Sequence, residues 1–113
     1  MEAAYQETSD PLLAFQLATL SILEEDYGAA IAYYRRTLAG MPDSFIVRNE
    51  LSILLTLAER RTDEALQVLG PAIESAGPLP GLVDTRAMLR IAAGAPEAAI
   101  DDLAADSDAG AIR

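Results

Sequence analysis

The side chains of this 113-residue sequence that could do chemistry are carboxylates and guanidiniums. There is no His and no Cys, and all eight basic residues are arginines. Without imidazole or thiolate ligands, zinc, haem and iron–sulfur sites are excluded, as are a cysteine nucleophile, a Ser–His pair and a disulfide framework. The absence of Lys also excludes Schiff-base chemistry. We therefore predict that the protein is not an enzyme and that it carries no metal and no cofactor.

The acidic side chains fall in short runs, such as Glu24-Glu25-Asp26 and Asp101-Asp102. Neighbouring residues of a helix point in different directions, and no glycine-bearing loop or ligand spacing accompanies these runs. They therefore indicate a solvated surface rather than a calcium loop or a catalytic carboxylate pair. The doublets Arg35-Arg36 and Arg60-Arg61 are likewise typical of surface pairing with acids.

The net charge of the chain is -10, from 18 acidic and eight basic residues. This balance disfavours a nucleic-acid reader, whose affinity depends on clustered Lys and Arg. No stretch approaches the ~20 uninterrupted apolar residues that span a membrane. The N-terminal ten residues are acidic and lack the apolar run of a secretory signal. We therefore expect a cytoplasmic protein.

Helical periodicity extends through the whole sequence, and no segment alternates as a strand would. Six helices are predicted between Pro, Gly and capping residues, over residues 11–26, 27–39, 45–59, 62–76, 82–93 and 96–106. Ser9 or Asp10 is the expected N-cap of the first helix, and Asp43 or Ser44 that of the third. Residues 107–113 are expected to be a tail or the start of a further helix. The sequence thus predicts one all-α domain.

These helices repeat in pairs. The small residues Ala30, Ala65 and Ala99 are spaced by 35 and 34 residues. The same register aligns three further sets: Ile31, Leu66 and Ile100; Tyr34, Leu69 and Leu103; and Ala18, Ser52 and Ala87. The one extra residue lies in the turn over residues 59–62, where an insertion costs little.

The stretch Asp26–Ser44 resembles the tetratricopeptide repeat (TPR) family. It has Tyr27 after an Asp, the small Ala30, the aromatic Tyr34 and a terminal Pro42 at that family's spacing. The resemblance covers three repeats, at about residues 11–44, 45–79 and 80–106, and implies a right-handed α-solenoid. In such a fold small residues lie where helices touch. The side chains of the Tyr34, Leu69 and Leu103 set would fill the space between neighbouring repeats.

The third repeat departs from the pattern. Arg86 and Arg90 replace large apolar residues, and we expect them to pair with Glu74, Asp101 or Asp102. Asp106 stands in a slot that is normally small, and Pro71 is expected to kink the preceding helix. The third repeat is either a degenerate unit or one that a following segment completes.

By this resemblance, the first helix of each pair lines a concave surface that takes a peptide or a helix. The residues expected on this surface are Phe15, Thr19, Ile22, Asn49, Ile53, Thr56, Asp84, Met88 and Ile91. Packing within the inner seam is an equal alternative for each. Of the residues that grip a C-terminal carboxylate in some members of the family, Asn49 alone matches. The mostly apolar surface therefore predicts a hydrophobic or amphipathic ligand.

Three functions remain open from the sequence. The first is a non-enzymatic protein-interaction module that binds an apolar or amphipathic segment of a protein. The second is a structural part of a longer repeat array, or a scaffold that self-associates through its terminal repeats. The third is a small acidic chaperone for exported hydrophobic proteins, a role that some bacterial members of the family have.

Overall fold

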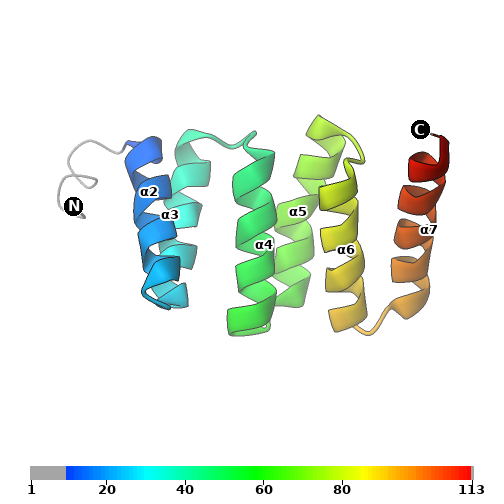
Figure 1. The fold of residues 1–113 in the computed structure, drawn as a ribbon. Coiled ribbons are helices and arrows are strands. Elements are labelled where there is room, and N and C mark those ends of the chain that lie inside the picture. Colours follow the sequence, from blue (N-terminus) through cyan, green and yellow to red (C-terminus); the bar gives the residue numbers. More distant parts are fainter. Residues whose placement is uncertain (1–9, 113) are drawn as a thin grey trace.

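Six α-helices make up the described part of the chain, which contains no strand. The computed structural model describes the backbone of residues 10–112 and the side chains of residues 10–104. The helices are α2 (Pro11–Leu23), α3 (Tyr27–Gly40), α4 (Phe45–Glu59), α5 (Thr62–Ala76), α6 (Pro80–Ala92) and α7 (Pro96–Ile112). They pack as three neighbouring pairs, α2 with α3, α4 with α5 and α6 with α7 (Figure 1). The all-α prediction is confirmed.

The pairs follow one another in a row, so the molecule is elongated. Its extents are 47 × 27 × 22 Å and its radius of gyration is 15.1 Å, against about 13 Å for a compact chain of this length. Helices α2, α4 and α6 lie on one side, with α3 and α5 behind them (Figure 1). Helix α3 contacts α4, and α5 contacts α6, so each pair packs against the next.

Side-chain caps start three helices, and two of them, at Asp10 and Ser44, are caps that the sequence predicts. Asp10, Asp26 and Ser44 each accept a hydrogen bond from a backbone N–H two or three residues on, at 2.9, 3.1 and 3.3 Å. Such caps satisfy backbone donors that a helix start leaves free. Of the expected alternatives, Ser44 rather than Asp43 caps α4, and Asp10 caps α2, whereas Ser9 lies outside the described residues.

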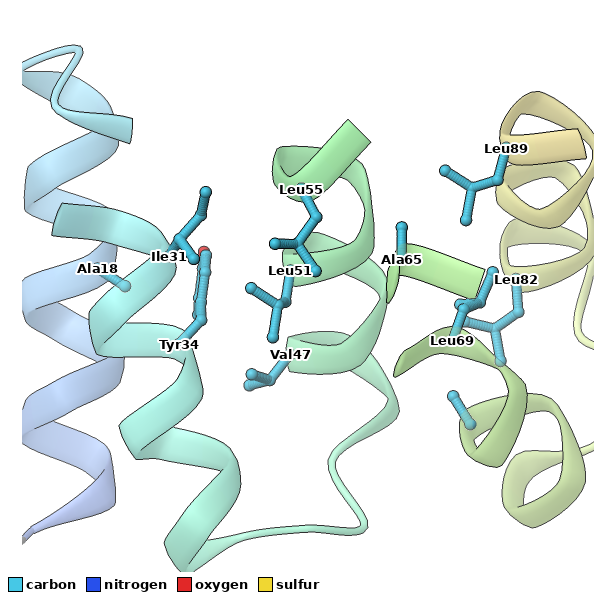
Figure 2. Packing of buried hydrophobic residues seen from close by; sticks show 11 residues of the cluster. Ala18, Ile31, Tyr34, Val47, Leu51, Leu55, Ala65, Leu69, Leu82 and Leu89 are labelled. Carbon is cyan, nitrogen blue, oxygen red and sulfur yellow. The ribbon is translucent and has the colours of Figure 1, made fainter. Parts of the chain in front are cut away.

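Small buried residues bring the helices together, as predicted. Six of them are at most 1% exposed: Ala18, Ser52, Ala87, Ala30, Ala65 and Ala99. Larger side chains fill the two interfaces between pairs. Ile31 and Tyr34 of α3 face Leu51 of α4, while Leu69 of α5 lies beside Leu82 of α6 in the same cluster (Figure 2).

The last helix breaks this pattern. Leu103, predicted to fill the space between neighbouring repeats, is 46% exposed, and Ile100 is 62% exposed. Their counterparts Ile31, Tyr34 and Leu69 are at most 4% exposed because the next pair covers them. Within the described residues no helix packs on the outer side of α7. The prediction for Leu103 is therefore wrong.

Three helix boundaries differ from the sequence prediction by two residues or more. Helix α2 ends at Leu23, because Glu25 takes a left-handed φ of 60° and three acids disfavour continuation at a helix C-terminus. Helix α6 begins at Pro80, so Asp84 lies in its second turn rather than its first. Helix α7 continues to Ile112 instead of ending near residue 106, since no Pro or Gly interrupts residues 97–109.

Helix α5 continues through Pro71, which removes one backbone N–H from the helix interior. Arg48 of α4 lies against this segment. Its Nη1 donates to the carbonyl of Val68 at 3.0 Å, and its Nε donates to the carbonyl of Pro42 at 2.8 Å. One side chain thus ties the turn before α4 to the proline-bearing part of α5.

Gly40, the last residue of α3, lies against the ring of Pro11 at the start of α2. A Cβ at residue 40 would stand 2.9 Å from two ring carbons, whereas a Cβ at Gly28 would meet nothing closer than 4.0 Å. We predict that Gly40→Ala lowers the free energy of unfolding by about 1 kcal/mol or more through overpacking. Gly28→Ala should raise it by about 0.5 kcal/mol. Urea unfolding followed by circular dichroism measures both, and equal stabilisation by the two changes would contradict this packing.

Candidate functional site

The side of the molecule formed by α2, α4 and α6, here called the front face, exposes large aliphatic side chains. Leu12 and Leu23 of α2 are 63% and 76% exposed, and Ile46 and Leu57 of α4 are 54% and 69% exposed. Ile91 of α6 is also exposed. Single exposed apolar residues are common on protein surfaces, whereas several on neighbouring helices are typical of an interaction surface.

The exposed residues of α2 and α4 follow one pattern. On α2, Leu23 lies eleven residues after Leu12, and on α4, Leu57 lies eleven residues after Ile46, so each pair shares one side of its helix. The α4 pair lies 34 residues after the α2 pair. The opposite sides of both helices are buried, with Leu17 of α2 and Leu51 of α4 at their centres.

The nine residues predicted for the binding surface divide into exposed and packed groups. Thr19, Asp84 and Ile91 are exposed, and Ile53 is half-buried. Three others are partly buried against the core cluster: Phe15, Ile22 and Met88. Thr56 is 7% exposed, and its hydroxyl has no hydrogen-bond partner among the described residues. Asn49 is half-buried.

Phe15 of α2 packs against Tyr34 of α3 within the first pair. Its ring meets that of Tyr34 edge to face, with 6.0 Å between the ring centroids. Burial raises the pKa of the Tyr34 hydroxyl above its ordinary value of 10.0, the carboxylate of Glu50 raises it further, and a hydrogen bond with Thr19 lowers it. Phe15 is thus partly buried against the core cluster, and Thr19 and Glu50 both act on the Tyr34 hydroxyl beside it.

The sequence prediction missed four aliphatic residues of the front face that are more than half exposed, namely Leu12, Leu23, Ile46 and Leu57. A signal for them is present in the sequence, because both helices carry apolar residues beyond their buried side at the same 34-residue spacing. The periodicity of α2 could not separate the two sides, since all but a few of its residues are apolar.

Two hollows in the surface are lined partly by residues of α4. One, of about 260 Å³, is lined by Tyr27 at the start of α3 and by Leu54, Leu57 and Ala58 of α4. The other, of about 300 Å³, lies where α4 and α6 begin and includes Asn49 and Glu50 among apolar neighbours. The first is suited to an aliphatic side chain, whereas the second combines apolar walls with hydrogen-bond acceptors.

Ion pairs lie away from the exposed sides of α2 and α4. Helix α2 has no charged residue between Pro11 and Leu23. Arg35 of α3 and Glu64 of α5 approach to 2.6 Å behind the front face, and Arg61 lies 3.8 Å from the same carboxylate. These arginines therefore pair on the outer surface, as the sequence indicates for such doublets.

Arg86 and Arg90 both bind Asp102 of α7, one of the three acids expected to pair with them. Nε and Nη2 of Arg86 donate to Oδ1 at 3.0 and 2.6 Å, and Nη1 of Arg90 donates to Oδ2 at 2.7 Å. Asp102 is 4% exposed, and the two arginine side chains are 29% and 31% exposed. The carboxylate is fully engaged by its own chain, so the cluster holds α6 to α7.

The described residues contain no group of three His, Cys, Asp or Glu side chains that could hold a metal ion. None of the helices in this part of the chain is long and apolar enough to cross a membrane. No protein-family model matches the chain, and a search of curated proteins finds no relative. Function must therefore be inferred from the residues and geometry of this chain.

We predict that Asp102→Asn lowers the free energy of unfolding by about 2 kcal/mol, because two arginines lose their shared counter-charge. This is below the cost for a fully buried pair, since both guanidiniums reach solvent. Asp101→Asn, an exposed neighbour, should have little effect. The combined change Arg86→Leu, Arg90→Leu and Asp102→Val should restore stability, because well-packed apolar residues replace buried ion pairs without loss. Chemical unfolding of the unchanged protein and the three variants measures these free energies. An Asp102→Asn variant as stable as the unchanged protein would contradict the prediction.

Proposed function

We propose that this chain is a non-enzymatic protein-interaction module whose front face binds an amphipathic helix or an apolar peptide. The observation that carries the proposal is the exposed aliphatic side of α2, with Leu12 and Leu23, repeated on α4 with Ile46 and Leu57. Leaving these side chains in water forgoes about 1.5–3 kcal/mol for each one that a partner could bury. A partner that covers them recovers this free energy.

The proposed architecture is a right-handed α-solenoid of three TPR-like repeats. Three features support it: the spacing of 34–35 residues, the row of helical pairs, and the small buried residue at each pair contact. In a solenoid of this kind the first helices line the concave side, so the front face would be a groove. The helices are held by the core behind them, so binding needs little reordering and keeps more of the contact free energy.

An amphipathic helix suits the front face because its own apolar side chains recur at similar spacing. The pairs on α2 and α4 lie eleven residues apart along their helices, about 16 Å at 1.5 Å per residue. A partner helix crossing α2 and α4 would cover one member of each pair, and one lying along a helix would cover both. The hollow beside Leu57 would take one of its aliphatic side chains.

Negative charges introduced on the front face by substitution test the proposed function. Peptides enriched from a random 16-residue library on the immobilised protein serve as probes, and fluorescence anisotropy measures their affinity. We predict that Ile53→Glu and Leu57→Glu each weaken binding at least tenfold, because a carboxylate replaces an apolar contact and must lose water. The circular dichroism spectrum of both variants should remain that of a helical protein. Met88 is unsuitable for this test because it packs against the core cluster.

Ile100→Glu is the matched control, because Ile100 is comparably exposed but lies on α7, away from the exposed sides of α2 and α4. It should bind the peptides as the unchanged protein does. Full affinity of folded Ile53→Glu and Leu57→Glu would show that the front face is not the binding surface.

A second candidate function, self-association, is favoured by the exposed side of α7. Ile100 and Leu103 align with Ile31 and Tyr34, which α4 covers, and no described helix covers the α7 pair. A helix of a second copy could occupy the same position. The charge of -10 on each copy opposes this contact, so screening salt should favour it.

We predict that the weight-average mass rises with protein concentration at about 0.5 M salt, where the Debye length is about 4 Å. The double change Ile100→Glu and Leu103→Glu should keep the chain monomeric under the same conditions. Multi-angle light scattering over a concentration series gives the result. A monomeric unchanged protein at every concentration would remove this candidate and leave peptide binding unaffected.

A further inference from the structure

The hollow between α4 and α6 has an unusual polarity. Its walls are apolar and come from the starts of both helices and from the turn before α6, with Phe45, Ile46, Leu79 and Leu82 as the side chains. Two polar residues, Asn49 and Glu50, also line it. The volume is about 300 Å³, which exceeds that of a single side chain.

The hydrogen-bond acceptors that line this hollow have no donor in the described part of the chain. The Oδ1 atom of Asn49 is buried and has no hydrogen-bond partner among the described residues. Glu50 is half-buried, and the described part of the chain offers it neither a hydrogen bond nor an ion pair. A desolvated acceptor without a partner costs free energy, and a partly desolvated carboxylate costs more.

Other acids with restricted solvent access in the described part of the chain are paired with arginines. Asp102 is shared by two arginines, and Glu64 lies 2.6 Å from Arg35. Glu50 differs because it lies on α4 between Ile46 and Leu57 and forms no ion pair with a described arginine. Its charge is thus directed toward whatever occupies the front face.

We propose that this hollow binds a basic side chain of the partner, with arginine favoured over lysine. The inference rests on the proposed function, because the side chain must arrive on a segment bound at the front face. A guanidinium has five N–H donors and no acceptor, so it can serve both the carboxylate of Glu50 and the amide oxygen of Asn49. Its aliphatic stem would lie along the apolar walls.

The charge of the whole chain acts in the same direction. A net charge of -10 attracts a basic partner and repels an acidic one before contact. The partner therefore has an apolar side that covers Leu57 and Ile46, and an arginine placed beside it that enters the hollow. This arrangement gives specificity, because a purely apolar helix would leave both acceptors unsatisfied.

The test compares an enriched library peptide that contains arginine with the same peptide carrying citrulline, its neutral isostere. On the unchanged protein, citrulline should weaken binding about tenfold, the loss of roughly one charged hydrogen bond. On Glu50→Gln, the arginine peptide should bind about tenfold more weakly, and citrulline should change little further. Asp101→Asn removes one exposed negative charge elsewhere and should behave as the unchanged protein.

Equal affinity of the two peptides for the unchanged protein would overturn the proposal, as would enrichment of peptides without a basic residue. If Leu57→Glu still abolishes binding in either case, the front face remains the binding surface and only the basic-side-chain site fails. Failure of the library to yield any peptide that depends on Leu57 would instead remove the proposed function, and this site with it.

Discussion

Each of the first two helical pairs buries the apolar side of its second helix against the pair that follows it. Ile31 and Tyr34 are covered by α4, and Leu69 is covered within the cluster that α6 completes. Small residues such as Ala30 and Ala65 allow this approach because they keep the helix backbones close. Since coverage passes from one pair to the next without returning, the chain forms a row instead of a closed bundle. The elongated shape and the open front face both follow from this constraint.

Different interactions hold together α6 and α7, the two helices of the third pair. No described residue of α7 belongs to the main core cluster, and its exposed Ile100 and Leu103 contribute nothing to the contact with α6. The buried Asp102, held by two arginines, stands where an apolar contact would otherwise lie. Such a cluster contributes directional specificity more than net stability, because desolvation offsets much of the attraction. It fixes how α7 sits on α6 at the end of the row.

An open row leaves one side of each first helix without a covering element. On α2 and α4 this side carries Leu12, Leu23, Ile46 and Leu57, where a solvated helix would carry charges. Glu50 is the exception within this apolar side, and its carboxylate has no counter-charge among the described residues. The proposed binding role rests on the apolar surface, on this acid and on the helices that support them from behind.

Local rules were sufficient for the helices themselves. Capping by Asp10 and Ser44, the breakers around residues 77–81 and the 34–35-residue spacing predicted most helix boundaries and the small buried residues that the repeat aligns, because these depend on a few neighbouring residues. The exposure of each side chain depended on which other helices pack against it in the fold. Helix α2 is apolar on all sides, so periodicity alone could not show that Phe15 packs inside while Leu23 lies in water. The same holds for Leu103, which matches Tyr34 in the repeat but is covered by no described helix. A side chain is buried only if it is apolar and another element also packs on it.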